Sequence, residues 1–349
     1  TKYATGPYGT NAEPYDGRPG SIQDGFNFQG DKNGSKWSTL VREVPRAVDT
    51  GLCDLRPESH VVKITHDASG KVNAVIYVDK DGNLQSQAAK AVCVAGNSIE
   101  TARLLLLSDS SMFPNGLANS SDQVGRNYMR HLTGSIYAWF DKPVNMHRGE
   151  TMAGIIKDEV THNPDRGFVG GYYMETLALG PAVLAAFIEP GAWGPEFAGW
   201  MDNYQNMAGM WIVGEDMPQA TNRVTLSSAS DQWGLPVANV HFDDHPNDIA
   251  MREYAYEKAE ALYNAVGAVG THRTPPYPST HNLGTCRMSA NPEDGVVDKW
   301  GRAHDVPNLF VSDGSVMTTG AAANPTLTIV AHAIRQAEYL ASELKAGNI

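Results

Sequence analysis

The stretch AVCVAGNSIETARLLLLS, residues 91–108, gives the clearest indication of the fold. It opens with small or apolar residues only, as expected of a strand that is buried on both faces in a parallel sheet. The chain then continues as a helix, with apolar residues at Ile99, Ala102 and Leu105 on one face. A strand that ends in Ala-Gly and passes directly into a helix is typical of a doubly wound α/β fold, in which ligands bind at the carboxyl ends of the strands. An ordinary α/β crossover would give the same pattern.

The preceding residues predict more strands and a helix. Strands are expected within residues 59–90, with turns at 67–71 (DASGK) and 79–83 (DKDGN). The segment STLVREVPRAVDTG predicts a helix from about Ser38 that ends at Gly51.

Residues 132–275 have a different character, because they are rich in aromatic residues, Met, Gly and Pro. The strand candidates GSIYAWF, MAGMWIV, NRVTLS and PVANVHF predict an antiparallel sheet in this region. A helix is expected from about Asn247 to Ala268. We therefore expect an α+β domain of the substrate-binding type at 132–275, between two α/β segments.

Composition argues against some kinds of partner. The 349 residues carry a net charge of −12 without a basic block, which argues against nucleic acid as the main ligand. The longest uncharged apolar run, at 176–188, is shorter than the roughly 20 residues that span a bilayer. The N-terminus lacks the basic and apolar regions of a signal peptide. Small neutral or cationic ligands are therefore expected.

Cysteine spacing and acidic clusters predict no metal site. Cys53, Cys93 and Cys286 lie at no metal-ligand spacing, and Cys93 is expected to be a buried small hydrophobe. The segment HFDDH, residues 241–245, has metal-binding residue types, but its place between a strand and a helix favours a solvated loop.

Two observations concern a phosphate-containing ligand. A dinucleotide-binding fold requires glycine at two positions of its first strand-to-helix turn, so that the backbone can approach the pyrophosphate. The chain contains no Gly-x-Gly sequence, so we expect that turn on an N-terminal segment or on another chain. The segment NLFVSDGS, residues 308–315, is expected to be a short buried strand that ends in Asp-Gly-Ser, where the N–H groups of Gly314 and Ser315 would form a small anion-binding concavity.

Asn324 and His281 have the side chains best suited to catalysis. Pro325 fits the first position of a helix, which makes Asn324 the N-cap and directs the next N–H groups out of the helix start. Such a start attracts negative charge on a bound ring; the alternative is a simple structural cap. His281, in the loop STHNLGTCRMS, is either a structural histidine or a base that accepts the proton of an alcohol.

Together, several segments resemble the glucose-methanol-choline (GMC) family of flavin oxidoreductases. The resemblance rests on HNLGTCRM, GVVDKWGRAHDVPNLFVSDGSVM and NPTLTIVAHAI, with AGNSIETARLLLLS, VGRNYMRH and NRVTLSS...DQWGLPV upstream. It extends from about Pro57 to the C-terminus, in the order of the family. The forms ANPTLT and GSKWSTLVREVPRA look most like those of sugar and polyol dehydrogenases and pyranose oxidases.

The resemblance implies roles for individual residues. His281 would be the active-site base, and Asn324 would be the second member of the catalytic pair. Arg130 stands where an acidic residue is common in the family, so we assign no role to residues 129–131. The residues expected to bind FAD are Val61 at the adenine, Gly96 and Asn97 at the AMP half, Asp313 and Gly314 at the flavin, and Pro325 and Thr326 at the isoalloxazine pyrimidine.

The fold class that follows is an α/β FAD-binding domain of the GMC type, incomplete at its N-terminus, with an α+β substrate domain that contains an antiparallel sheet. The missing glycine fingerprint implies a companion N-terminal segment or chain. The expected parts are 1–56 in the substrate or cap region, 57–131 in the FAD-binding domain, 132–275 as the substrate-binding domain, and 276–349 returning to the FAD-binding domain with the catalytic pair.

The predicted function is FAD-dependent oxidation of an alcohol group in a sugar, polyol or related secondary alcohol, with hydride transfer to flavin N5. One alternative is an FAD-containing lyase of the same fold, of the hydroxynitrile lyase type. Another is a non-catalytic fragment that needs a companion chain. An electron-acceptor protein is a further expected partner, and a periplasmic or secreted location is favoured over a cytoplasmic one.

Overall fold

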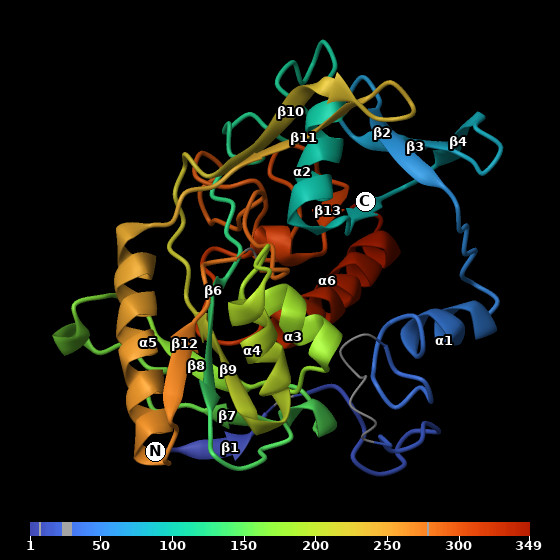
Figure 1. Ribbon diagram of the computed structural model, residues 1–349. Coiled ribbons are helices and arrows are strands. Elements are labelled where there is room, and N and C mark those ends of the chain that lie inside the picture. The colour runs from blue at the N-terminus through green and yellow to red at the C-terminus, as the bar shows by residue number, and fades with distance from the viewer. Residues whose placement is uncertain (7, 23–29, 278) are drawn as a thin grey trace. The chain divides into compact units, whose positions relative to one another are not determined.

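The computed structural model describes residues 1–6, 8–22, 30–277 and 279–349, and their contacts divide the chain into two compact units (Figure 1). Unit 1 comprises residues 1–55, 132–214 and 249–278, whereas unit 2 comprises 56–131, 215–248 and 279–349. Residues 215–248 were expected within the substrate-binding domain at 132–275, but this division places them in unit 2. Nowhere in the described ranges is a helix both long and apolar enough to cross a bilayer.

Unit 1 is built on a six-stranded sheet in which every neighbouring pair of strands is antiparallel. An antiparallel sheet was predicted for this part of the chain. Its strands, in order across the sheet, are β1 (Tyr3–Thr5), β7 (Gly154–Ile156), β8 (Tyr172–Thr176), β9 (Met207–Gly214), β6 (Leu132–Trp139) and β12 (Gly270–Arg273).

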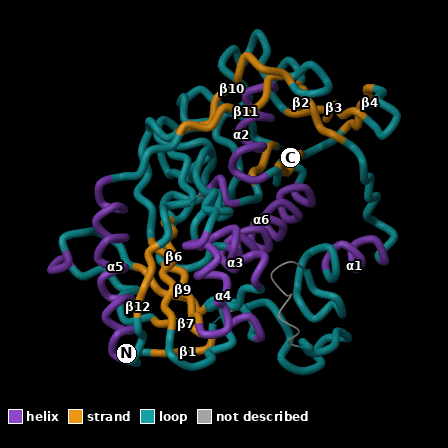
Figure 2. Tube along the Cα trace, in the orientation of Figure 1, coloured by secondary structure: helices purple, strands orange, loops and turns teal. Residues whose placement is uncertain are grey.

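Apolar layers cover both faces of this sheet, because successive side chains of a strand point to opposite faces. Ile136 of β6 is buried in one layer with Tyr256 of helix α5 (Pro246–Ala265). Its neighbour Tyr137 is buried in the other layer with Leu184 of α3 (Pro181–Ile188). Figures 1 and 2 show α5 running beside β12 within this unit. Further helices of unit 1 are α4 (Pro195–Asp202), α1 (Glu43–Asp49) and short 3₁₀ turns at Met146–Arg148, Pro164–Arg166 and Tyr204–Asn206.

Unit 2 combines small sheets with two helices, α2 (Asn97–Leu107) and α6 (Thr326–Ala346). Strand β5 (Val92–Val94) pairs in parallel with β13 (Leu309–Val311), and β5 leads directly into α2, as the opening stretch predicted. The three-stranded sheet has its turns at the two predicted places. The remaining elements of unit 2 are β2 (His60–His66), β3 (Val72–Val78), β4 (Leu84–Ala88), β10 (Arg223–Ser230), β11 (Pro236–His241) and the 3₁₀ turn Gly314–Val316.

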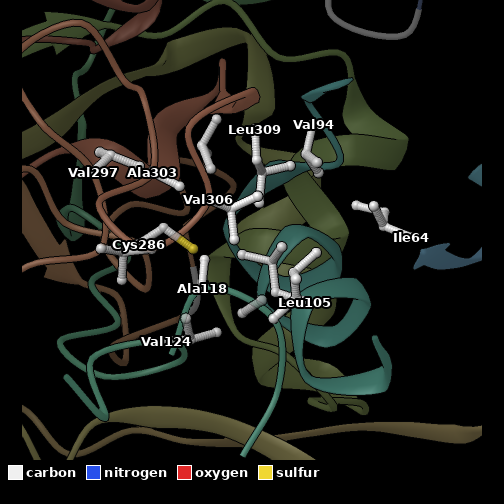
Figure 3. Close-up of a cluster of buried hydrophobic side chains, with 14 of the residues drawn as sticks. Ile64, Val94, Leu105, Ala118, Val124, Cys286, Val297, Ala303, Val306 and Leu309 are labelled. Carbon is white, nitrogen blue, oxygen red and sulfur yellow. The ribbon is translucent and has the colours of Figure 1, made fainter. Parts of the chain in front are cut away.

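The core of unit 2 contains side chains from distant parts of the sequence (Figure 3). Leu105 of α2 and Leu309 of β13 are both fully buried in it, with Val306 from the loop before β13. Truncating a fully buried leucine to alanine costs roughly 2–5 kcal/mol, so this cluster fixes α2 on the β5–β13 pair.

Three sequence-based expectations need correction. Strands β10 and β11 form a separate hairpin of unit 2 and are not part of the large antiparallel sheet. Cys93 is exposed, because Val92 and Val94 point into the core and the residue between them points to the opposite face. The helix predicted up to Ala268 ends at Ala265.

Candidate active site

The turn between β5 and α2 is held by its own polar side chains. Asn97 adopts a left-handed conformation with φ of 68°, and its Oδ1 accepts a hydrogen bond from the backbone N–H of Ile99 at 2.9 Å. The N–H of Gly96 donates to Oγ1 of Thr101 at 3.0 Å. Asparagine tolerates this conformation better than most residues, which explains why it follows the glycine.

The turn after β13 is connected to this first turn by one hydrogen bond. The hydroxyl of Thr101 donates to Oδ2 of Asp313 at 2.5 Å, and Oδ1 of Asp313 accepts the N–H of Ser315 at 2.9 Å. Because that N–H is already bonded, Ser315 does not offer it to an anion, and this part of the sequence prediction is wrong. The predicted residues Gly96, Asn97, Asp313 and Gly314 do lie together.

A cavity of about 360 Å³ opens between β2, β5 and α2. Val61 and Gly96, both predicted to bind the cofactor, line it, and Cys93 faces it as well. Its volume falls in the range of about 300–1,000 Å³ that is typical of small-molecule sites. Arg103 on its wall donates to Asp231 at 2.5 Å and to Glu100 at 3.1 Å, so its charge is paired. The remaining lining is mostly apolar: Ile64, Val75, Val92, Val94, Ala95, Leu104 and Leu107, with His60.

The segment that carries His281 runs alongside residues 127–131. Met129 and Leu283 exchange two backbone hydrogen bonds, each of 2.9 Å. Gly284 allows this close approach, because its φ is 73° and a Cβ there would lie 2.0 Å from the carbonyl oxygen of Asn127. The two segments therefore bring the residue after Arg130 next to His281.

That residue is His131, and it forms a pair with His281. Their Nδ1 atoms are 3.0 Å apart, and Nε2 of His131 lies 2.8 Å from the carbonyl oxygen of Ala321. His131 is fully buried. Burial, together with the neighbouring His281, lowers the pKa of His131 to about 3, although the Ala321 carbonyl acts in the opposite direction. Burial also lowers the pKa of His281. Both imidazoles are therefore neutral at pH 7.

The loop before α6 is attached to this pair through Ala321. Helix α6 begins at Thr326, and Pro325 rather than Asn324 occupies the N-cap position, one residue later than predicted. Asn324 is half-buried, Pro325 is buried and Thr326 is exposed. Asn324 lies in the same loop as Ala321, three residues later in the sequence. Its catalytic role remains a prediction.

The histidine segment also contacts α2. The hydroxyl of Ser98 donates to the carbonyl oxygen of Asn282 at 2.8 Å, and Thr285 donates from its hydroxyl to the carbonyl of Ser98 at 2.7 Å. The N–H of Gly284 donates to the carbonyl of Gly314 at 3.2 Å. The segment that carries the predicted base is thus hydrogen-bonded to the turns that carry predicted cofactor residues, all within unit 2.

Comparison with known proteins identifies the family of this chain. Two family models, both described as GMC oxidoreductase, match residues 8–133 and 218–333, which together make up most of the chain. The chain belongs to the GMC oxidoreductase family. The family's cofactor is FAD.

Named relatives include two dehydrogenases. The 2-methyl-1,2-propanediol dehydrogenase of Mycolicibacterium austroafricanum is 38% identical over 94% of this chain and 61% of its own length. The fructose dehydrogenase large subunit of Gluconobacter japonicus is 29% identical over 98% of this chain and 63% of its own length. This chain therefore spans about three fifths of the curated relatives it matches. A variant of Aspergillus oryzae formate oxidase has the same fold, with a TM-score of 0.63 at 18% identity, covering 90% of this chain and 64% of the oxidase.

The residues present fit the FAD of GMC oxidoreductases. The mostly apolar cavity beside Val61 and Gly96 suits a flat heteroaromatic ring, and the polar turns at Asn97 and Asp313 are hydrogen-bonded to the segment that carries His281. No group of three or more metal-binding side chains was found among the residues that the structure describes.

Sequence reasoning missed His131 as a member of the site. The segment VGRNYMRH had been noted, but the unusual Arg130 left it without a role. The backbone N–H of Arg130 donates to the buried carboxylate of Asp216 at 2.9 Å, and its guanidinium pairs with Asp244 at 3.1 Å. An acidic side chain in place of Arg130 would face those same carboxylates, which gives a physical reason for the arginine.

Proposed function

We propose that this protein oxidises an alcohol group of a small diol, polyol or sugar, using FAD, with His281 as the base. The observation that carries the proposal is the neutral His131–His281 pair, with 3.0 Å between its Nδ1 atoms, on a segment that is hydrogen-bonded to the turns of the predicted cofactor residues. Removing hydride from an alcohol carbon requires that the hydroxyl proton be accepted, and a neutral imidazole near pH 7 serves this purpose.

Two side chains and the start of helix α6 have separate roles in the proposed reaction. His281 accepts the hydroxyl proton, and Asn324 donates a hydrogen bond that orients the same oxygen. When bound, FAD supplies the acceptor for the hydride that leaves the carbon. The first N–H groups of α6, after Pro325, provide positive potential for negative charge on the flavin's pyrimidine edge.

The cavity between β2, β5 and α2 is the proposed site of the cofactor's AMP half. Val61, which lines the cavity, would contact the adenine, and Gly96 and Asn97 would border the AMP half. Asp313 and Gly314, in the turn that the Thr101 hydrogen bond fixes, would lie at the flavin. The chain contains no Gly-x-Gly turn, so we propose that a companion segment or chain grips the pyrophosphate.

The substrate and partner classes rest on the relatives. One acts on a branched propanediol and another on fructose, by their names, so a small polyhydroxylated alcohol is proposed here. The second is the large subunit of its enzyme, which supports an assembly with a further subunit. We propose an electron-acceptor protein as that kind of partner, and a periplasmic or secreted location.

A spectroscopic experiment tests this function. The complete chain, with any companion that copurifies, is supplied with FAD under anaerobic conditions and mixed with diols, polyols and sugars. Loss of the oxidised flavin's visible absorbance with at least one of these substrates is expected. Bound flavin that no alcohol bleaches, but that accompanies cleavage of a cyanohydrin, would favour a lyase instead. Failure to bind FAD even with the companion would reject the proposal.

A further inference from the structure

The contacts of the two histidines determine which of their ring nitrogens carry hydrogens. Nε2 of His131 is 2.8 Å from the carbonyl oxygen of Ala321. A carbonyl oxygen only accepts hydrogen bonds, so Nε2 of His131 must carry a hydrogen. A neutral imidazole has one N–H, and therefore Nδ1 of His131 has a lone pair and accepts.

The same reasoning then applies to His281. Its Nδ1 lies 3.0 Å from the accepting Nδ1 of His131, so it must be the donor and carry the hydrogen. The other ring nitrogen of His281, Nε2, is left with a lone pair. We infer that His131 is a positioning residue that fixes His281 in the Nδ1–H tautomer, so that Nε2 of His281 accepts the hydroxyl proton of the substrate. The alcohol would lose no proton to the opposite tautomer, whose Nε2 already carries one.

The electrostatics of the pair support this assignment. A charged His131 would donate from both nitrogens and could not accept from His281. Burial keeps it neutral, since its pKa is lowered to about 3 and its side chain is fully buried. Neutral rings leave one consistent proton arrangement along the line from the Ala321 carbonyl to His281.

The backbone around His131 holds it in place on three sides. Its φ is 62°, and its neighbours are fixed by the Met129–Leu283 pairing on one side. The N–H of Arg130 donates to Asp216. On the Ala321 side, a Cβ on Gly320 would lie 3.4 Å from Cδ2 of His131, so this glycine leaves little free space beside the ring. These contacts give the imidazole a fixed direction toward His281.

This inference rests on the proposed function for its catalytic meaning, but the tautomer is a property of the chain itself. The first test is nitrogen-15 NMR of the full chain with labelled histidine, with signals assigned by their loss in His131 and His281 variants. We expect Nδ1 protonated and Nε2 unprotonated in His281, and the reverse in His131. A wild-type His281 that carries its hydrogen on Nε2 would overturn the inference, whatever the variants show.

Two variants of similar shape separate the hydrogen bond from packing. His131→Asn keeps an acceptor near the Nδ1 position and suits a positive φ, whereas His131→Leu has the same branching without an acceptor. We expect His281 to keep its tautomer in His131→Asn and to lose it in His131→Leu. An unchanged tautomer in a folded His131→Leu chain, judged by its amide spectrum, would contradict the positioning role.

Flavin reduction gives the second readout. With FAD bound, His131→Leu should slow reduction by about 10²-fold, and His131→Asn should recover most of that loss, in line with ordinary acid–base contributions. Equal slowing in both variants would count against the inference. If the tautomers are as stated but no alcohol reduces the flavin, the proposed function fails and the tautomer assignment stands. If alcohols reduce the flavin while His281 holds the opposite tautomer, only the inference fails.

Discussion

The hydroxyl of Thr101 donates a 2.5 Å hydrogen bond to the carboxylate of Asp313, joining two turns that are 212 residues apart. Thr101 also accepts the N–H of Gly96, so one hydroxyl connects the start of α2 to the end of β13. The two turns carry most of the residues predicted to bind FAD. Their relative position therefore depends on a side chain that the family resemblance did not single out.

Thr101→Val keeps the shape of this side chain and removes its hydroxyl. The half-buried carboxylate of Asp313 and the N–H of Gly96 both lose a partner, so the free energy of unfolding should fall by roughly 1–3 kcal/mol, and FAD affinity should fall. Urea denaturation and flavin fluorescence titration would measure both. Thr225→Val, which removes a 3.2 Å hydrogen bond in the exposed β10–β11 hairpin, is the control and should change neither by much. A Thr101 variant as stable as that control would contradict the prediction.

Gly284→Ala tests the close approach that brings the two histidines together. The new Cβ would lie 2.0 Å from the carbonyl of Asn127, in addition to the strain of a φ of 73°. The matched control is Gly234→Ala, which has a φ of 78° and nothing within 4 Å of the added carbon. In the Gly234 variant the free energy of unfolding should fall by about 1–2 kcal/mol, from backbone strain alone. The Gly284 variant should lose clearly more stability in a denaturant titration, and equal losses would show that the contact is not tight.

His281→Ala should slow flavin reduction by about two to three orders of magnitude while FAD stays bound, because the hydroxyl proton loses its acceptor. Stopped-flow absorbance with saturating substrate measures the rate. His241→Ala, at a position whose side chain is about half exposed, serves as the control and should leave the rate unchanged. Nearly intact reduction in the His281 variant would remove it from the catalytic role.

Asn324→Ala distinguishes an orienting side chain from a structural cap. Since Pro325 occupies the N-cap position of α6, we expect no drop in melting temperature from the loss of a helix cap. The rate of flavin reduction should fall about tenfold to a hundredfold, as the substrate oxygen loses a hydrogen bond. A drop of about 1 kcal/mol in stability with an unchanged rate would instead favour the structural role.

The pH dependence of stability should reveal the neutral His131. In the unfolded chain its pKa returns to about 6.5, whereas in the folded chain it is about 3. Between these values the unfolded state binds more protons, so this group lowers stability as pH falls below 6.5, by roughly 1 kcal/mol per pH unit. Burial, followed by the nearby Asp248, raises the pKa of Asp216 to about 7. For this group the folded state binds more protons, so its contribution to stability increases as the pH falls below 7.

The comparison of wild type with His131→Asn isolates the histidine, because Asp216 is common to both chains. Denaturant midpoints at pH 7 and pH 5 should show a larger loss in the wild type than in the variant. Parallel curves for the two chains would mean that folding does not lower the pKa of His131.

Local patterns predicted most of the elements in unit 2. The run AVCVAG and the helix after it were recognisable because a buried parallel strand and an amphipathic helix have different apolar periods. The same reasoning misplaced Cys93, since an apolar run does not show which face of a strand is covered. It also grouped β10 and β11 with the large sheet, because strand patterns do not specify the partner of a hairpin.

The sequence by itself determined the family, the order of the elements and the identity of His281 and Asn324 as candidate residues, because these depend on short motifs and local periodicity. Only the tertiary structure decided which side chains meet. The His131–His281 contact and the Thr101–Asp313 bond join residues 150 and 212 positions apart. Such contacts result from the packing of α2, the β5–β13 pair and the segment around Gly284 against one another, and no local pattern encodes them.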